Sequence, residues 1–299
     1  MVNPLNSPTA EDPRALAAAL KRNPTAPRTL FSMAMSVLTM VFMGIALLPL
    51  VAVLSYVLIK GGSRLGLALF TELPPPPLVD GGGFGNAIVG TLLTVALGAA
   101  ISIPIGILAA VYLSEFARDT AIANWINFFT NVLSGVPSIV VGVFAYSTVV
   151  LTTGTFSAIA GGIALAVLML PIVVRTTEEA LESIPGEVRQ ASVGLGATDF
   201  QTTMGVVLPA AVPSIVTGVM LAIARAAGET APLIFTALFS QYWLNGIMQP
   251  TPTLSVLVYN FAITPYENQQ ELAWAGSLIL VALIFITSIL SRFVTRQRA

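Results

Sequence analysis

An arginine and a glutamate interrupt the otherwise apolar stretch LAIARAAGETAPLIF at residues 221–235. Arg225 and Glu229 are four positions apart, so on a helix their side chains lie on one face, a turn apart. Ionisable side chains within long apolar segments are costly, and they mark an ion pathway or a pair that joins two helices. A guanidinium offers a planar fork of N–H donors, which suits a tetrahedral oxyanion. We therefore take Arg225 and Glu229 as a candidate anion site.

The carboxylate of Glu229 sets the preference between oxyanions in this hypothesis. It would orient the Arg225 fork or accept a proton from the ligand. The latter favours phosphate, which keeps a proton at neutral pH, over sulfate, which keeps none. Thr230 adds a hydroxyl beside the pair, and Gly218 and Ala222 continue the same face with small side chains that leave room for a ligand. The alternative is a structural ion pair that joins two helices and binds nothing.

The composition of the chain is that of a multi-span membrane protein. Of its 299 residues, 56% are hydrophobic and 9% are charged, whereas a soluble domain carries about 25% charged residues. The sequence contains no Cys and no His, which excludes thiolate and histidine metal sites and His-dependent nucleophilic triads. No G-x-x-x-x-G-K-[ST] motif is present either, so the chain is not itself a P-loop ATPase.

Charge-poor stretches predict an all-α membrane protein with six transmembrane helices. About 20 residues cross the hydrocarbon core, so the uncharged residues 120–174 are interpreted as two spans joined near residues 151–157. The other spans are expected at Leu30–Ile59, Gly81–Ser114, Leu208–Phe239 and Leu272–Ser291. Arg225 lies 225 − 208 = 17 residues after the start of the fifth span, ~25 Å along a helix and near mid-membrane. Pro232 predicts a bend further along the same helix.

The basic residues predict which side of the membrane each loop faces, because cytoplasmic loops are enriched in Lys and Arg. With the N-terminus inside, only Lys60 and Arg64 face outward, and Arg225 remains in the bilayer. The ten basic residues on the inner side are Arg14, Lys21, Arg22, Arg28, Arg118, Arg175, Arg189, Arg292, Arg296 and Arg298. Both termini are therefore expected in the cytoplasm. On the outer side, TLSVLVYNFA (residues 253–262) is expected as a short helix along the membrane surface or as an ordinary hairpin.

The connection between the fourth and fifth spans, residues 175–209, carries detailed local signals. A helical piece is expected over Glu187–Gly194, after a Pro-Gly pair, and Thr198 is a natural N-cap for a second piece. Gly196 permits a sharp turn between the two. A short helix-turn-helix of this kind suits docking into a groove of another protein, and a plain linker is the alternative.

The spacing in this connection is similar to the EAA loop of ABC importer permeases, E-A-A-x3-G-x9-I-x-L-P. The sequence reads Q-A-S at residues 190–192, Gly196, nine residues, and then V-V-L-P at residues 206–209. Gln190 stands where the family has an acid, and Ser192 where it has an alanine. The resemblance implies a type I (MetI-like) importer permease whose loop forms a coupling helix in a cleft of a separate ATPase. It assigns that contact to Gln190, Ala191, Ser192, Gly196, Ala197 and Thr198.

Further stretches narrow the resemblance to the A-type permease of the bacterial phosphate (Pst) importer. They are ARAAGETAP (224–232), TELPPPP (71–77), GNAIVGTLL (85–93), LSGVPSIVVG (133–142) and LPIVVRTTEEAL (170–181). In that family Arg225 and Glu229 match the translocation site, which Thr230 adjoins, and Arg175 matches another recurrent position. The match covers roughly residues 30–293. It divides the chain into a cytoplasmic tail (1–29), a first helix (30–59) and a five-helix core (84–293) with the coupling loop at 175–209.

The resemblance implies a multi-pass permease subunit of the bacterial cytoplasmic (inner) membrane that moves inorganic phosphate by alternating access and is not an enzyme. The implied partners are a homologous permease in a heterodimer, two ATPase subunits that bind ATP and Mg, and an extracytoplasmic phosphate-binding protein. No cofactor on this chain and no nucleic acid is expected. Arg175 is either a positive anchor at the inner surface or a second contact for the departing anion.

Two alternative functions remain at this point. One is a permease for another oxyanion, sulfate or molybdate. The other is a proton-coupled secondary transporter that uses Arg225 and Glu229, for which inverted repeats would be expected, and the two halves of the sequence show no convincing repeat. An intramembrane aspartyl hydrolase is excluded, because no aspartate lies in a predicted span: Asp12 is in the N-terminal tail, and Asp80, Asp119 and Asp199 lie in predicted loops.

Overall fold

A computed structural model shows a chain built of helices, of which residues 27–118 and 120–296 are described. The chain divides into two compact units, residues 1–56 and 57–299. Most of the expected cytoplasmic tail lies outside the described residues. Helix α2 (Pro27–Gly62) begins in the first unit and ends in the second, and its buried residues, Val57 and Gly61, belong to the second. The helix is long and apolar enough to cross a membrane, as suits a helix in lipid.

Five helices of the described part are long and apolar enough to cross a membrane, or six if one bent pair counts as a span. This confirms the all-α, multi-span class. Helix α4 (Gly85–Val111) continues into a π-helical turn, η1 (Tyr112–Phe116), and α8 is Ala158–Glu182. The next span joins α10 (Asp199–Thr202), η3 (Thr203–Val207) and α11 (Leu208–Ala227), and the last is α14 (Glu267–Arg296).

The third expected span is a broken helix. Helices α5 (Ala121–Gly135) and α6 (Ser138–Ala145) meet at a bend of 103°, and α6 continues through η2 (Tyr146–Val150) and α7 (Leu151–Thr153). Val136 is extended because it precedes a proline, and Pro137 has no N–H to continue the helical ladder. A span was predicted here, but no bend within it. The turn expected at residues 151–157 is present, with Gly154 at φ +72°.

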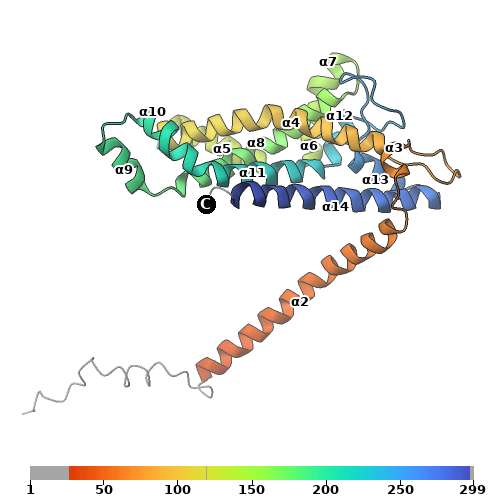
Figure 1. Ribbon diagram of the computed structural model, residues 1–299, viewed down its shortest axis with the longest axis horizontal. Coiled ribbons are helices and arrows are strands. Elements are labelled where there is room, and N and C mark those ends of the chain that lie inside the picture. The colour runs from red at the N-terminus through yellow and green to blue at the C-terminus, as the bar shows by residue number, and fades with distance from the viewer. Residues whose placement is uncertain (1–26, 119, 297–299) are drawn as a thin grey trace, which may run out of the picture. The chain divides into compact units, whose positions relative to one another are not determined.

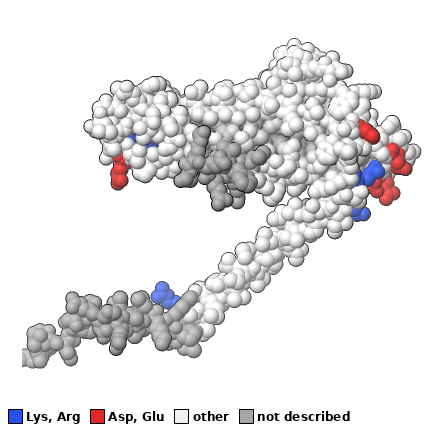
Figure 2. Space-filling view, viewed as in Figure 1, with Lys and Arg blue, Asp and Glu red and all other residues white. Residues whose placement is uncertain are grey.

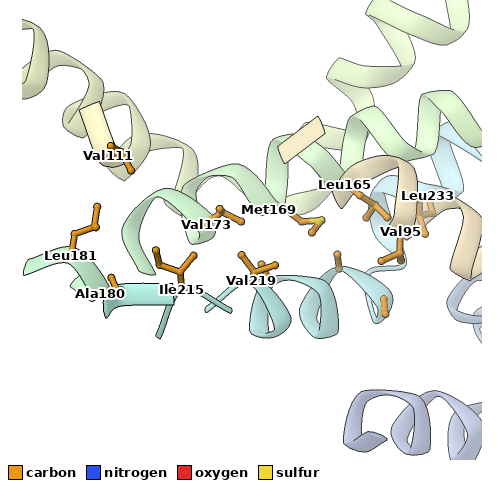
Figure 3. Packing of buried hydrophobic residues seen from close by; sticks show 14 of the residues in the cluster. Val95, Val111, Leu165, Met169, Val173, Ala180, Leu181, Ile215, Val219 and Leu233 are labelled. Carbon is orange, nitrogen blue, oxygen red and sulfur yellow. The ribbon is translucent and has the colours of Figure 1, made fainter. Parts of the chain in front are cut away.

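Helix α8 lies at the centre of the second unit, with α4 along one side and α11 along another (Figure 1). A Cβ added to Gly106 of α4 would come within 2.7 Å of Val173 Cγ1 on α8. Small residues that allow such close approach are typical of helix pairs in membranes. Figure 3 shows Met169 and Val173 of α8 facing Val219 of α11 in the largest hydrophobic cluster.

The fifth span ends earlier than predicted. We expected one helix bent at Pro232 and running to Phe239, but α11 ends at Ala227 and a separate helix, α12 (Ala231–Thr236), follows. Pro232 lies in the first turn of α12, where its missing N–H breaks no helical hydrogen bond. The proline therefore starts a new helix instead of kinking the old one.

The outer segment expected at the membrane surface is packed inside the protein. Helix α13 (Leu254–Ala262) confirms the helical alternative, but Leu254, Leu257 and Phe261 are buried. They lie in a cluster with residues of α4 and α14. The position along the membrane surface was therefore wrong, because the apolar face of α13 has protein partners.

Short helices lie at both ends of the second unit (Figure 1). Helices α9 (Gly186–Gly194) and α10 lie at one end, and α3 (Ala68–Thr71) and α13 at the other. Helix α8 runs on to Glu182 and α10 starts at Asp199, so the connection is shorter than the predicted residues 175–209. On the face drawn in Figure 2, charged side chains of the second unit gather at these two ends and the described surface between is free of them.

Candidate functional site

Arg225 lies in the last turn of α11, directly before the break that leads to α12. The C-terminal end of a helix carries partial negative charge, so a cation is favourable there. The break is fixed from two sides. The Ser255 hydroxyl of α13 donates to the backbone oxygen of Glu229 at 2.8 Å. A Cβ on Gly142 of α6 would come within 2.7 Å of Pro232 Cα. The residues that follow Arg225 are therefore held in place by α13 and α6.

Arg225 and Glu229 form a loose ion pair. The distance from Arg225 Nε to Glu229 Oε1 is 3.8 Å, and the side chains are 68% and 18% exposed in the single chain. A charge-assisted N–H···O bond is about 2.7–2.9 Å long, so this contact leaves the guanidinium donors free for another acceptor. Among the described residues, Glu229 is the one ionic partner of Arg225.

A cleft of about 230 Å³ adjoins the pair. That volume far exceeds the roughly 15 Å³ that one water molecule needs. Its lining comes from the α5–α6 bend, from α8 and from the α11–α12 break: Leu133, Ser134, Val136, Pro137, Ser138, Leu168, Pro171, Ile172, Arg225 and Glu229. Leu168, Pro171 and Ile172 are central in α8, which spans Ala158–Glu182. The cleft therefore lies about halfway along a membrane-length helix.

The structure does not bring every predicted site residue to this cleft. Thr230 does not line it, and the backbone oxygen of Thr230 accepts hydrogen bonds in the first turn of α12. The small residues expected to leave room for a ligand serve helix packing instead. A Cβ on Gly218 would come within 2.3 Å of Thr176 Oγ1 on α8, and Ala222 is buried against the same core. That expectation was wrong, because α8 fills the space.

Arg175 lies one turn beyond the cleft on α8 and bridges two helices. Its Nη2 donates to Asn131 Oδ1 of α5, and its Nη1 lies 3.3 Å from Glu178 Oε2. The side chain is 40% exposed, so part of the guanidinium still faces outward. The geometry thus combines an anchor between α5 and α8 with a positive charge next to the cleft.

The connection between α8 and α11 has the local structure that its sequence predicts. Helix α9 ends at Gly194, and Gly196 adopts φ +92°, a conformation that favours glycine. The Thr198 side chain caps α10, and Gln201 completes a capping box with it. Ser192 Oγ lies 2.9 Å from Thr202 Oγ1, which joins α9 to α10. Of the residues assigned to ATPase contact, Ser192 and Thr198 thus hold the shape of the loop.

The other residues predicted to contact the ATPase lie near two exposed apolar side chains that were not predicted as part of the site. Gln190 and Ala191 are exposed, and Ala197 is half-buried. Leu195, between the two glycines, is 91% exposed, and Phe200 is 61% exposed. We call Leu195 and Phe200 the apolar tip. A leucine between two glycines of a solvated turn was the available signal, because nothing nearby in the sequence can cover it.

No group of three or more His, Cys, Asp or Glu that could hold a metal ion occurs among the described residues. The site is therefore built from one arginine, one carboxylate, helix ends and apolar walls. It can bind and orient an anion.

Comparisons with known proteins assign the fold and the family. Residues 102–298 match the family described as the binding-protein-dependent transport system inner membrane component. The phosphate transport system permease protein PstA of Yersinia pestis is 42% identical, over 88% of this chain and 89% of the relative. The protein of the same name from Xylella fastidiosa (strain 9a5c) is 41% identical, over 78% of this chain and 81% of the relative.

Two solved permeases share the fold at low identity. A bacterial alginate ABC transporter aligns with a TM-score of 0.62 at 14% identity, over 90% of this chain and 95% of that one. The MetNI methionine ABC transporter in an inward-facing conformation aligns with a TM-score of 0.58 at 22% identity, over 71% of this chain and 95% of that one. The helical arrangement is thus that of ABC importer permeases, and together with the relatives above it shows that the chain belongs to the PstA family of binding-protein-dependent inner-membrane permeases.

Proposed function

We propose that this chain carries inorganic phosphate inward through the cleft beside Arg225, as one permease subunit of an ATP-driven importer. The guanidinium donates to the oxyanion, and Glu229 turns the fork toward it or accepts its proton. Alternating access opens the cleft to one side of the membrane and then to the other. The names of the relatives support phosphate as the cargo.

The observation that carries this proposal is the exposure of the Arg225 side chain, 68% in the single chain, beside a cleft halfway along α8. An arginine that faced hydrocarbon at that depth would cost several kcal/mol. That cost is lower if the exposed face of Arg225 lines a water-filled passage. In such a passage a guanidinium with free donors is a binding site for an anion. The loose 3.8 Å contact with Glu229 supports a ligand site over a closed structural pair.

The apolar tip supports docking to a separate ATPase. Leu195 and Phe200 protrude from a turn that is held rigid by the Thr198–Gln201 capping box and the Ser192–Thr202 contact. A small rigid element with exposed apolar side chains fits a cleft in another protein, where those side chains become the anchors. This chain lacks a P-loop, so two nucleotide-binding subunits would supply ATP hydrolysis.

The complete transporter in this proposal holds further partners. A homologous permease covers the exposed face of Arg225 in a heterodimer, and an extracytoplasmic phosphate-binding protein delivers the anion. Both termini lie in the cytoplasm, on the side of the docking loop. The distribution of basic residues along the chain supports this orientation.

The direct test is phosphate uptake by cells that depend on this transporter and carry the Arg225→Gln variant. Glutamine keeps much of the side-chain length but removes the charge, so uptake is expected to be lost while the assembled complex is recovered in normal amounts. The control is Arg64→Gln, because Arg64 pairs with Glu271 at 3.2 Å and neither residue lines the cleft. Normal uptake by Arg225→Gln would remove the anion-site proposal.

Two further measurements, competition by other oxyanions and the energy source of uptake, decide between the remaining hypotheses for the transported ion and the transport mechanism. An excess of sulfate or molybdate is expected to leave phosphate uptake unchanged, since Glu229 favours a protonated oxyanion. Collapse of the proton gradient at constant ATP should also leave uptake unchanged. Inhibition by sulfate would point to another oxyanion as cargo, and dependence on the proton gradient would point to a secondary transporter.

A further inference from the structure

Arg189 lies in α9, the helix before the apolar tip, which we call the docking helix. Its side chain links α9 to the ends of two other helices. Its Nη2 and Nε donate to the two carboxylate oxygens of Glu115, at 2.8 and 3.2 Å. The same guanidinium donates to the backbone oxygens of Leu181, at 2.8 Å, and Ile184, at 2.5 Å. We call these four residues the Arg189 junction. It joins α9, the π-helical turn η1 and the end of α8.

The ion pair in this junction is well shielded and directional. The side chains of Arg189 and Glu115 are 20% and 7% exposed, and a two-pronged arginine–carboxylate contact fixes the relative orientation of both groups. Hydrogen bonding to Glu115 raises the pKa of the Arg189 guanidinium, so the arginine stays charged at any physiological pH. Its remaining donors satisfy backbone oxygens at the C-terminal end of α8, which lack partners within the helix.

Helix α9 has few other ties to the bundle. It buries none of its side chains within the described part of the chain. Pro185 precedes it, and the turn at Gly196, with φ +92°, follows it. A force on the apolar tip would therefore swing α9 about these two points if nothing else held it. The Arg189 junction opposes this movement on the side of η1 and α8, and the Ser192–Thr202 contact opposes it on the side of α10.

Helix α4 connects the junction to the cleft. It continues into η1, which carries Glu115, and its Gly106 lies so close to α8 that an added Cβ would come within 2.7 Å of Val173 Cγ1. The same α8 contributes Leu168 and Ile172 to the cleft wall. The chain itself joins α9 to α8 and, through α10, to α11, whereas α4 meets α9 through the side chains of Arg189 and Glu115.

We propose that Arg189 is a positioning residue that makes the docking helix, η1 and the end of α8 one rigid body, so that movement of the docked ATPase reaches α4 and α8 together. The inference rests on the proposed docking function of the apolar tip. Glu115 and Arg189 stay paired throughout the transport cycle, and loss of the pair lets α9 pivot without moving the cleft.

The test measures coupling in the assembled transporter with Glu115→Gln and Arg189→Lys. Glutamine removes the carboxylate charge, and lysine keeps the positive charge but loses the fork. In both variants the ATPase subunits are expected to co-purify in normal amounts. Phosphate and binding protein should no longer stimulate ATP hydrolysis, and the amount of phosphate imported per ATP hydrolysed should fall several-fold. The matched control is Glu271→Gln, which breaks the Arg64–Glu271 pair and is expected to leave coupling unchanged. Normal coupling in both junction variants would overturn the proposal.

A covalent link gives a second readout that does not depend on the stability of the ion pair. The chain contains no Cys, so Glu115→Cys with Arg189→Cys offers one reactive pair for a reducible bifunctional thiol reagent. The double variant is expected to be uncoupled before reaction, coupled after cross-linking and uncoupled again after reduction. A cross-linked complex that binds ATP but does not transport would overturn the proposal, because the two residues would then need to separate.

A variant of the apolar tip separates this inference from the docking function. If Leu195→Ala keeps full affinity for the ATPase, the docking function itself is wrong and the inference falls with it. If Leu195→Ala weakens docking while the junction variants stay coupled, the docking function stands and the rigid junction alone is refuted.

Discussion

Replacing Leu195 by alanine measures the contribution of the apolar tip to ATPase docking. The side chain is 91% exposed in the single chain, so truncating it removes almost no packing from the fold. Exposed substitutions of this kind change the free energy of unfolding by no more than about 0.5 kcal/mol. If Leu195 is buried in a cleft of the ATPase, the whole effect appears in binding.

The magnitude follows from the carbon atoms removed. A leucine carries three more side-chain carbons than an alanine, and each buried methylene contributes about 0.8 kcal/mol, about 2.4 kcal/mol in total. Because about 1.4 kcal/mol corresponds to a tenfold change in affinity, the dissociation constant should rise about 50-fold. ATPase-driven uptake should fall in parallel at limiting ATPase concentration.

The assay is equilibrium binding of the purified ATPase subunit to the detergent-solubilised permease, wild type against Leu195→Ala. Leu67→Ala is the matched control, since Leu67 is 84% exposed and directly precedes α3, which lies at the opposite end of the second unit from α9 (Figure 1). It is expected to bind the ATPase as the wild type does. An affinity of Leu195→Ala within twofold of the wild type would refute the reasoning, because a side chain buried at the contact cannot be truncated without loss.

Three further substitutions test the fold and the loop. Gly218→Ala places a Cβ within 2.3 Å of Thr176 Oγ1, so overpacking should cost about 1–3 kcal/mol and lower the thermal midpoint of the complex. Gly205→Ala should leave the midpoint unchanged, because a Cβ there would meet no described atom within 4 Å beyond its own stretch of helix. Gly196→Val forces a β-branched residue to φ +92°, and phosphate-stimulated ATP hydrolysis should be lost; full stimulation would contradict a strict need for this turn. Thr198→Ala removes the cap of α10 and should destabilise that helix by about 1 kcal/mol. Amide hydrogen exchange in α10 should then be faster, and an unchanged exchange rate would mean that the cap is dispensable.

Local signals in the sequence predicted the local structure of the connection between α8 and α11 well. Thr198 followed by Gln201 is a capping box, and both interactions are present. Gly196 was expected at a sharp turn, and its φ is +92°. Such features depend on a few neighbouring residues, so the sequence states them directly. The exposure of Leu195 was not predicted, because it depends on what the rest of the chain leaves uncovered.

Features that depend on packing between distant segments were predicted less well. The buried face of α13 and the contact of Gly218 with Thr176 involve partners from other helices, and neither follows from spacing along one segment. The bend of 103° between α5 and α6 had a local signal in Pro137, but a proline kinks some membrane helices and breaks others. Glu115 and Arg189 are 74 residues apart in the sequence, and periodicity could not pair them.

Arg225 and Glu229 were predicted as a site because of the cost of ionisable groups in an apolar segment. The cost of ionisable groups singles out these two residues, but it does not predict the cleft beside them. The cleft requires the α5–α6 bend and the early end of α11, both of which the sequence analysis had drawn as continuous helix. The ionisable pair was thus predictable from composition and spacing, and the shape of the cleft beside it was not.

The central claim is that a positive charge at position 225 attracts the transported anion. The most direct measurement is phosphate uptake by Arg225→Cys before and after reaction with thiosulfonate reagents, since the chain contains no other Cys. We expect no uptake before reaction, partial recovery with a reagent that attaches an aminoethyl cation, and none with a neutral reagent of similar size. Equal recovery with both reagents, or full uptake before either, would contradict a role for that charge in phosphate transport.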